Sequence, residues 1–471
     1  MRPHLLAPLA AAAAVLLAAA PAGAATWTPP TTVSAPHTFV SPLRAAASGN
    51  GSVVLDWGFQ DGVGTGATGG ARGASLLPGQ SAFGPERTLP GATTQLAPYA
   101  VRAVAALQQS GLDRAGRRVR LAVAFGSLQG PFAGAPNGPF LGTPRRVATD
   151  DVAFVPSLAM GSNGSGLLAW IARASGNRRV VKVSLRGPGG RFGTPSIIAG
   201  TGRANSIVAA VGARGERVVA FERGGRLLAR LRSVGHNWGS IQDLGAVAAG
   251  TENDLAALIG GAGRATIVDV HRQLSEGGTT GPLLVDAWVR PAGASRFRAA
   301  QRLESGGQVQ SSAPALVALG QRGALLAWLG TDPASQGTAG GPGRRVNVSL
   351  MDEATARFGA PQALSAPGEA AAGVGAASNG SDAVVSWIRL APTSDTSGQV
   401  LASLRLGGAA AFSPAEVVSP PENASATAPG FVPVTGGGRP FVAWTARPGG
   451  EGPGIPLAQI QTLVRVARRE P

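Results

Sequence analysis

One short phrase recurs along the whole chain, and this recurrence limits the possible folds more than any other feature. The phrase is a run of small and aliphatic residues that ends in an aromatic residue. Its copies lie at residues 53–57, 121–125, 167–170, 218–221, 325–328, 384–387 and 441–444, with a degenerate copy at 266–269. A second phrase starts with an aromatic residue and continues, often through Pro, into β-branched residues or leucine; its aromatics are Trp27, Phe83, Phe140, Phe192, Trp238, Phe297, Phe358 and Phe412. A period of roughly 55 residues predicts a fold built from repeated supersecondary units.

Each repeat contains four short stretches with the character of β-strands. In residues 156–199, the run 156–160 is followed by Asn163-Gly164, which favours a type I′ hairpin turn, whose two central residues both need a positive φ. Residues 167–171 form the second stretch, residues 179–186 alternate apolar and polar side chains, and residues 197–198 belong to the fourth. No helical period follows the first two dozen residues. The sequence therefore predicts four antiparallel strands per repeat.

Both phrases occur eight times, which predicts an all-β fold. We expect a single eight-bladed β-propeller of four-stranded antiparallel blades, or a seven-bladed one if a weak copy is not a blade. A four-stranded sheet cannot bury both faces alone, so neighbouring blades stack and large rings fill the space between them. We therefore expect burial of Trp170, Trp328, Trp387 and Trp444; the alternative is an exposed aromatic platform for carbohydrate.

The two ends of the chain are expected to complete one blade together. Residues 27–34 have the pattern of a fourth strand that no first strand precedes. The last repeat supplies strands near 431–434, 441–444 and 457–466, without a fourth. Pairing of residues 27–34 with the strand that ends near Val466 would close the propeller and remove an open sheet edge.

The strand rhythm and the aromatic positions resemble those of secreted bacterial β-propellers of the sialidase-like kind and, more loosely, WD-repeat propellers. The resemblance covers nearly the whole chain and implies the fold. The sharper motifs are absent, since there is neither a Ser-x-Asp-x-Gly-x-Thr-Trp box nor a Gly-His and Trp-Asp pair. Sialidase chemistry would need a Tyr nucleophile beside a carboxylate, an Asp acid/base and an arginine cluster. Tyr99, the single tyrosine, and Arg102 and Asp56 are the residues that could supply these groups.

The first 24 residues have the pattern of a secretory signal peptide. Arg2 supplies the positive start, residues 9–20 the apolar stretch, and Ala22-Gly23-Ala24 the small residues of a cleavage site. The pattern predicts a propeller domain of residues 25–471 that is secreted to the cell envelope or medium. No transmembrane anchor is expected, because a spanning helix needs about 20 apolar residues. The alternative is a buried N-terminal helix.

Few residues of the chain are suited to metal or cofactor chemistry. There is no cysteine, and the histidines are isolated in sequence, so neither a disulfide nor a structural zinc site is expected. Loops of the Asp-x-Asp-x-Asp type and a phosphate-binding loop with its lysine are missing, and no cofactor or other metal site is expected.

The formal net charge is +16, and Lys182 is the only lysine. Two explanations stay open: a GC-rich genome, which favours Arg, Ala, Gly and Pro codons together, or a surface for anionic partners. The arginines occur singly and in pairs spread over the chain, such as Arg117-Arg118, Arg145-Arg146, Arg178-Arg179 and Arg344-Arg345. Nucleic acid is not an expected partner, because no single stripe collects them.

Two acidic residues break the pattern of the repeat. Asp56 stands where other copies have Ala, Ser or Val, and Asp269 ends its copy where the others have Trp or Phe. An ionised carboxylate there must be paired or reach solvent, because burial of an unpaired charge is costly. Either both are structural and bonded to backbone amides or arginine, or their blades line a ligand site at the mouth of the channel. Asp56, Tyr99, Arg102 and Asp269 are therefore the candidate ligand-binding residues.

These observations favour a monomeric, secreted, non-catalytic β-propeller that acts as a binding module or scaffold at the cell envelope. Its expected partners are proteins or glycans, including anionic polymers. One alternative is a glycoside hydrolase or lyase of the sialidase-like type, but no acidic pair recurs at a strand end, so enzymatic activity is not expected. Another alternative is a structural surface protein.

Overall fold

The computed structural model describes residues 26–47, 53–62, 68–76, 80, 82–89, 93–99, 103–111, 118–127, 144–153, 156–174, 178–202, 204–247, 254–274, 280–306, 313–321, 323–332, 343–390, 397–434, 437–447 and 461–470. These residues form thirty-three β-strands and no α-helix. No helix in this part of the chain is long and apolar enough to cross a membrane. The all-β class predicted from the sequence is therefore confirmed, whereas the expected signal peptide and Phe140 lie outside the described residues.

The strands follow one another in sets of four, as the repeat predicted. The first four sets are β2 (Phe39–Ala47), β3 (Val53–Asp61), β4 (Thr68–Leu76) and β5 (Arg87–Leu89); β6 (Thr93–Tyr99), β7 (Ala103–Gly111), β8 (Arg118–Ser127) and β9 (Arg145–Asp151); β10 (Ser157–Met160), β11 (Gly166–Arg173), β12 (Arg179–Arg186) and β13 (Ser196–Gly202); and β14 (Ala204–Val211), β15 (Arg217–Arg223), β16 (Arg226–Arg232) and β17 (Gln242–Ala246). Each set is an antiparallel sheet in which consecutive strands are neighbours.

The second half of the chain continues the same way with shorter outer strands. Its sets are β18 (Asp254–Ile259), β19 (Ala265–Leu274), β20 (Thr280–Arg290) and β21 (Gln301–Gly306); β22 (Ala315–Leu319), β23 (Gly323–Thr331), β24 (Arg344–Asp352), β25 (Arg357–Phe358) and β26 (Gln362–Ala363); β27 (Ala371–Ser378), β28 (Ala383–Leu390), β29 (Ser397–Arg405) and β30 (Glu416–Val417); and β31 (Glu422–Val434), β32 (Gly437–Arg447) and β33 (Leu463–Arg468). The last two sets merge into one eight-stranded sheet because the long β31 also pairs with β29.

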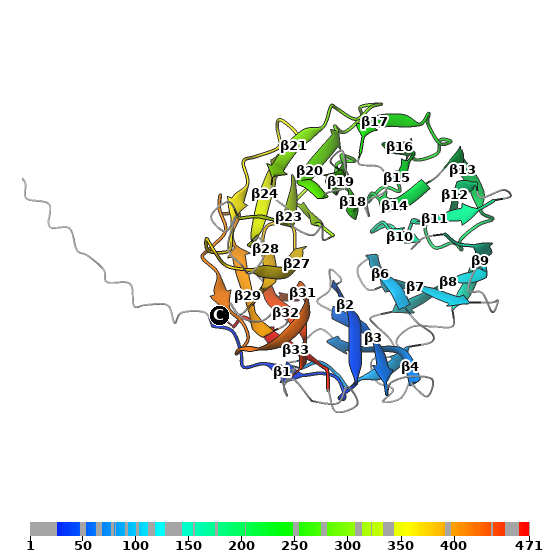
Figure 1. The fold of residues 1–471 in the computed structure, drawn as a ribbon. Helices are drawn as coiled ribbons and strands as arrows, with labels where there is room; N and C mark the ends of the chain where they lie inside the picture. The colour runs from blue at the N-terminus through cyan, green and yellow to red at the C-terminus, as the bar shows by residue number, and fades with distance from the viewer. Residues whose placement is uncertain are drawn as a thin grey trace, which may run out of the picture.

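The sheets are arranged in a ring (Figure 1). The first strand of each set contacts the first strand of the next set, in the order β2, β6, β10, β14, β18, β22, β27 and β31, and β31 in turn contacts β2. The later strands of each set lie progressively farther from the centre (Figure 1).

The two ends of the described chain pair with each other. Strand β1 (Thr31–Thr32) runs antiparallel to β33, with Thr31 opposite Val466. Isolated bridges extend this contact on both sides, between Trp27 and Arg469 and between His37 and Thr462. The predicted pairing of residues 27–34 with the strand near Val466 is therefore confirmed.

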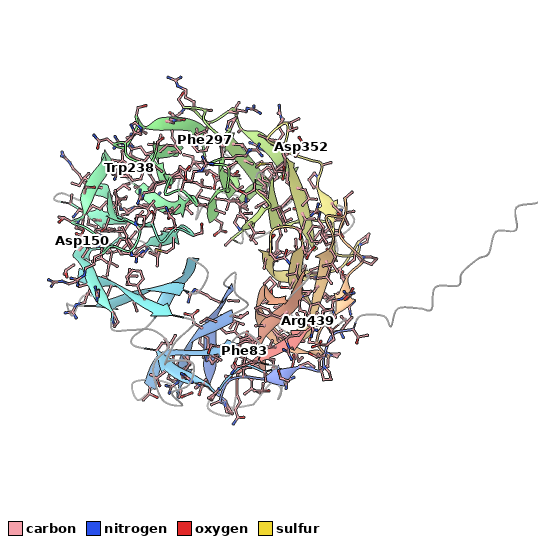
Figure 2. All side chains as sticks on the ribbon, turned by 180° about the vertical axis from the view of Figure 1, so that it is seen from behind. Phe83, Asp150, Trp238, Phe297, Asp352 and Arg439 are labelled. Atoms are coloured by element: carbon pink, nitrogen blue, oxygen red, sulfur yellow. The ribbon has the colours of Figure 1, made fainter. Side chains whose placement is uncertain are left out.

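The hydrophobic core consists of clusters that lie between successive sheets. Trp170, Trp328, Trp387 and Trp444 have 0% of their surface exposed, so the prediction of burial is confirmed. The described aromatics of the second phrase pack against the same clusters: Trp27, Phe83, Phe192, Trp238, Phe297, Phe358 and Phe412. Figure 2 shows Phe83, Trp238 and Phe297 at three places around the ring. Aromatic recurrence therefore reflects packing between sheets.

The hairpin between β10 and β11 differs from the predicted turn type. Gly164 has a φ of 80°, but Asn163 is not among the described residues with positive φ. Gly164 donates its N–H to the carbonyl of Gly161 at 2.9 Å, and Asn163 Oδ1 accepts the N–H of Ser165 at 2.8 Å. The prediction of a type I′ turn was wrong, because one extra residue lets Gly164 alone adopt the left-handed conformation.

A repeated polar contact joins neighbouring sheets, and we call it the indole clamp. Trp170 on β11 donates its indole N–H to Asp150 Oδ2 on β9 at 3.0 Å, and Lys182 Nζ on β12 lies 2.7 Å from the same oxygen. Trp170 and Lys182 are register partners, so both reach one carboxylate of the adjacent sheet. The same arrangement recurs between sheets with Trp328, Glu304 and Asn347. A related contact lies within the eight-stranded sheet, where Trp444 and Arg465 bind the two carboxylate oxygens of Glu422 at the start of β31, which pairs there with β29.

Candidate functional site

The two acidic residues selected from the sequence are buried in different sheets. Asp56 lies on β3 with 0% of its surface exposed, and its Oδ2 is 3.8 Å from Nη1 of Arg44, its register partner on β2. Neither carboxylate oxygen has a hydrogen-bond partner within the described part of the chain. Burial raises the pKa of Asp56 to about 7, and the charge of Arg44 opposes this rise. Asp56 is thus held in the interior beside one cation.

Asp269 lies on β19, on the other side of the ring (Figure 1). Its Oδ2 is 3.0 Å from His271 Nδ1, and its register partner is Asp286, which accepts two hydrogen bonds from Arg302 at 2.5 and 2.9 Å. Burial raises the pKa of Asp269, and His271 acts in the opposite direction. The structure does not bring Asp56 and Asp269 together, and a ligand-binding role for either stays a prediction.

The other two candidates cannot be placed as side chains. Tyr99 is the last residue of β6, opposite Ala103 on β7, and only its backbone is described. Arg102 lies outside the described residues. Their predicted roles in binding therefore stay predictions.

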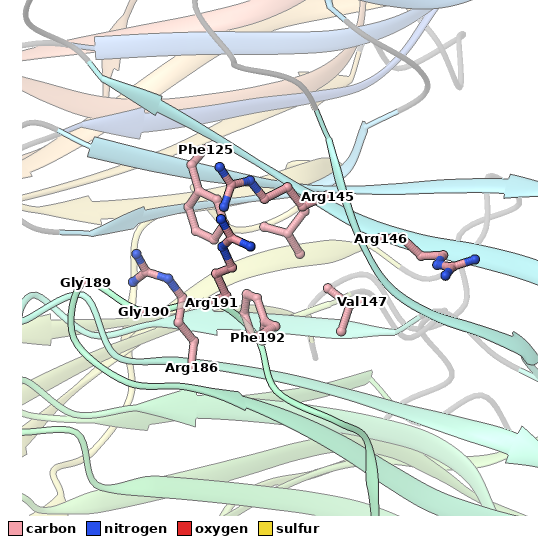
Figure 3. A pocket seen from close by; sticks show the side chains of 10 residues that line it. Phe125, Arg145, Arg146, Val147, Arg186, Gly189, Gly190, Arg191 and Phe192 are labelled. Atoms are coloured by element: carbon pink, nitrogen blue, oxygen red, sulfur yellow. The ribbon is translucent and has the colours of Figure 1, made fainter.

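A pocket of about 800 Å³ opens where β8 and β9 meet β12 and the turn that follows it (Figure 3). We call it the arginine pocket. Its walls come from two neighbouring sheets, and its lining consists of Val123, Phe125, Arg145, Arg146, Val147, Arg186, Gly189, Gly190, Arg191 and Phe192. This volume is typical of sites for small organic ligands.

The turn after β12 places Arg186 and Phe192 side by side. Arg186 is the last residue of β12 and forms an isolated bridge with Phe192. Between them, Gly190 donates its N–H to the carbonyl of Gly187 at 3.1 Å, and Gly189 has a φ of 66°. Glycine is needed at this position because side chains disfavour the left-handed region. The turn therefore carries Arg191 and Phe192 back against the end of the strand.

Arg186 is fixed before any ligand arrives. Its side chain is 7% exposed, its Nη1 donates to the carbonyl of Gly164, and its guanidinium carbon lies 4.6 Å from the centre of the Phe125 ring. The Phe125 and Phe192 rings stack at 6.3 Å with an angle of 21° between their planes. Cation–π contact and ring stacking both hold one wall of the pocket in place.

The other three arginines of the pocket have exposed side chains. The side chains of Arg145, Arg146 and Arg191 have neither a hydrogen-bond nor an ion-pair partner among the described residues. None of the described residues that line the pocket carries a carboxylate. In Figure 3 the guanidinium group of Arg146 points away from those of Arg145, Arg186 and Arg191. The pocket thus presents positive charge without a counter-charge in the described part of the protein.

Some arginines elsewhere in the ring donate hydrogen bonds to backbone carbonyl groups. Arg217 donates to the carbonyls of Gly215 at 2.9 Å and Arg186 at 2.8 Å, and Arg290 donates to the carbonyls of Gly263 at 2.6 Å and Ala294 at 3.0 Å. Such contacts satisfy carbonyl groups at turns, and a planar guanidinium with five donors suits them better than an ammonium. Part of the high arginine content is therefore structural, and the arginine pocket is an exception.

Sequence reasoning missed this pocket. The pair Arg145-Arg146 was noticed, but it was treated as one of several scattered pairs. A usable signal was present, because Arg191 directly precedes the aromatic of a fourth-strand phrase and the arginine pair begins the fourth strand of the preceding repeat. Neighbouring sheets bring equivalent outer strands close together, so these positions were bound to be near one another.

No protein-family model and no curated protein sequence matches the chain. Among solved structures, the β-propeller domain of the Trilobed protease from Pyrococcus furiosus is similar at 8% identity, with 76% of this chain and 91% of that chain covered and a TM-score of 0.40. The polysaccharide lyase Uly1 is similar at 9% identity, 83% and 93% coverage and a TM-score of 0.44. The NanB sialidase from Streptococcus pneumoniae is similar at 8% identity, 92% and 68% coverage and a TM-score of 0.38. The chain resembles these structures in overall fold alone, and the activities in their names belong to those proteins.

Proposed function

We propose that residues 25–471 form a single eight-bladed β-propeller and that β1 completes the blade of β31, β32 and β33. In this interpretation the eight-stranded sheet is two blades joined where β31 reaches β29. Two observations support the proposal: eight first strands contact one another in chain order with β31 against β2, and both sequence phrases occur eight times. Residues 1–24 are proposed to be a cleaved signal peptide, and the protein is proposed to be a secreted monomer.

We propose that this propeller is a non-catalytic binding module for anionic glycans and that the arginine pocket is its binding site. The observation that carries the proposal is the set of exposed guanidinium groups of Arg145, Arg146 and Arg191, which have no partner among the described residues. Like charges held close together without counter-ions repel one another, so an anionic ligand relieves an unfavourable interaction. Guanidinium groups also bind carboxylate, sulfate and phosphate oxygens through paired hydrogen bonds.

A glycan fits the apolar part of the same pocket. The Phe125 and Phe192 rings are partly exposed there beside Val147. Aromatic rings offer an apolar face on which the C–H groups of a sugar can lie, while the arginines bind its charged substituents. Hydrolysis of a glycosidic bond by the usual route needs two carboxyl groups about 5–9.5 Å apart. The described lining of the arginine pocket offers no carboxyl group, which supports binding without catalysis.

The test measures binding of the full mature protein to fluorescein-labelled dextran sulfate, polygalacturonate and neutral dextran by fluorescence anisotropy. We expect both anionic polymers to bind and neutral dextran not to bind. Binding should weaken as salt is added, because the Debye length falls to about 8 Å near physiological ionic strength. The double variant Arg145→Gln/Arg191→Gln should lose affinity on the order of tenfold or more, since it removes two charge-assisted contacts.

The matched control removes the same charge elsewhere. Arg214 and Arg296 are exposed and lie outside the arginine pocket. The variant Arg214→Gln/Arg296→Gln should bind nearly as the unaltered protein does. An equal loss in both variants would mean that net charge alone attracts the polymers, and the proposal would be rejected. Turnover of either glycan would contradict the non-catalytic part.

A further inference from the structure

We infer that the arginine pocket selects sugars that carry a tetrahedral oxyanion ester, a sulfate or a phosphate, over sugars whose charge is a carboxylate. This inference rests on the proposed function and narrows it to one class of ligand. It follows from the number and the separate origins of the guanidinium groups that border the pocket.

The guanidinium groups come from three separate places in the fold. Arg145 begins β9, Arg186 ends β12, and Arg191 lies on the turn that leads away from β12. Arg186 lies on the Phe125 ring, and Arg145 and Arg191 border the same pocket (Figure 3). A ligand group in this pocket therefore meets donors that arrive from different directions.

The shapes of the possible anions differ in a way that matters here. A carboxylate is planar, and its two oxygens can be satisfied by the paired N–H groups of one arginine. A sulfate or phosphate ester has three free oxygens that point away from the bond to the sugar, and each can accept hydrogen bonds from a different donor. Three guanidinium groups approaching from three elements therefore match a tetrahedral anion better than a planar one.

Charge balance favours the phosphate ester in particular. None of the described lining residues is acidic, and the described acids of β9 are engaged elsewhere: Asp150 binds Lys182 at 2.7 Å, and Asp151 lies 3.9 Å from Arg173. A single carboxylate would balance only one of the charges of Arg145 and Arg191. A phosphate ester carries between one and two negative charges at neutral pH. A sulfate ester carries one negative charge, as a carboxylate does, so its preference rests on its three oxygens.

The two phenylalanine rings explain why the ester should be attached to a sugar. Phe125 and Phe192 form a stacked pair within the same lining. Bare inorganic ions would contact the arginines alone, whereas a sugar ester would also cover apolar ring surface. Burial of apolar surface is favourable in proportion to its area. Sugar esters should therefore bind more tightly than the free ions.

The experiment is isothermal titration calorimetry of the mature protein with glucose 6-phosphate, glucose 6-sulfate, glucuronate and glucose, and with inorganic phosphate and sulfate. These sugars share one ring and differ in the charged group. We expect both esters to bind on the order of tenfold more tightly than glucuronate, and glucose not to bind. The relative affinities of the two esters show which of the two oxyanions the pocket prefers.

Two variants separate the parts of the site. Arg145→Gln/Arg191→Gln should abolish the preference for esters over glucuronate, whereas the control Arg214→Gln/Arg296→Gln should keep it. Phe192→Leu should lower the affinity for the sugar esters to about that for the inorganic ions. The affinity for the ions themselves should not change. Far-ultraviolet circular dichroism and a thermal melt check that each variant is folded.

The outcomes also separate this inference from the proposed function. If glucuronate binds as tightly as the esters, or if anionic polymers bind through the pocket but the esters do not, the inference is overturned and the proposed function stands. If neither polymers nor esters depend on Arg145 and Arg191, both are overturned.

Discussion

Strand β9 carries charged side chains at both ends, but those at one end join two sheets and those at the other border a pocket. At its end, Asp150 is held by Trp170 and Lys182 of the next sheet and forms an indole clamp. At its start, Arg145 and Arg146 have no partner among the described residues and border the arginine pocket. The clamp and the pocket thus occupy one boundary between the same two sheets.

The difference teaches how a charged side chain can be assigned to stability or to binding. A charge that shares hydrogen bonds with two groups of a neighbouring sheet fixes the relative position of the sheets. A charged side chain without a partner repels nearby charges of the same sign instead, and it can bind an oppositely charged ligand. The clamp joins the same two sheets that form the walls of the pocket.

The largest effect is expected for loss of the clamp's aromatic ring. Trp170→Ala should lower the free energy of unfolding by about 3–5 kcal/mol, because it leaves a cavity between two sheets and removes a donor from Asp150. Chemical denaturation followed by tryptophan fluorescence and circular dichroism measures this change. Trp328→Ala should behave similarly, because Trp328 is equally buried and also clamped. A loss below 1 kcal/mol for both would show that the clamps are dispensable.

A second test compares the clamp with Asp56, a buried carboxylate that has no clamp. Because its pKa in the folded protein, about 7, is above the usual value of 3.8, the folded state binds the proton more tightly than the unfolded state. Folding stability from this group is therefore greatest at low pH and falls as pH rises from about 4 through 7. Between pH 5 and pH 8 the loss should be about 2.5 kcal/mol.

The measurement is the free energy of unfolding of the unaltered protein and of Asp56→Asn across this pH range. Asp56→Asn has no titrating carboxyl at this position, so it should not lose stability as pH rises. The unaltered protein should therefore become progressively less stable than the variant between pH 5 and pH 8. Parallel curves for Asp56→Asn and the unaltered protein would refute a raised pKa of Asp56.

The third effect concerns the charge in the clamp itself. Asp150→Asn keeps an acceptor for the indole but removes the charge that Lys182 pairs with, and should cost about 1–2 kcal/mol because this pair is only partly exposed. The matched control is Asp243→Asn, which breaks a more exposed ion pair with Arg226 and should cost less. If Asp243→Asn lowers the free energy of unfolding as much as Asp150→Asn does, the position of the clamp between sheets adds no stability.

The smallest effect on stability is expected at the pocket. Arg145→Gln/Arg191→Gln should change the free energy of unfolding by less than about 0.5 kcal/mol, and in the stabilising direction at low salt, because it removes repulsion between exposed charges. The same variant should have the largest effect on binding. Marked destabilisation would place these arginines among the structural ones and would erase the contrast between the two ends of β9.

The candidate site could be predicted only in part. Asp56 and Asp269 stood out because they break the pattern of the repeat, and both are indeed unusual in the structure, being fully buried with few partners. Sequence could not tell that their carboxylates are enclosed, because exposure depends on what the neighbouring sheet places against them. The sequence places Arg145 and Arg191 on equivalent outer parts of two successive repeats, but it does not show that their side chains border one pocket, because that depends on how the two sheets pack.

The sequence by itself determined the all-β class, the four-stranded antiparallel unit, the burial of Trp170 and its counterparts, and the pairing of residues 27–34 near Val466. These features follow from local alternation, from turn residues and from a period repeated along the chain, all of which act within one unit or between adjacent units. Only the tertiary structure decided which charges are paired. Whether Arg145 is free and Asp150 is clamped depends on side chains of a different sheet, and the energy of a charge is set by the groups that surround it.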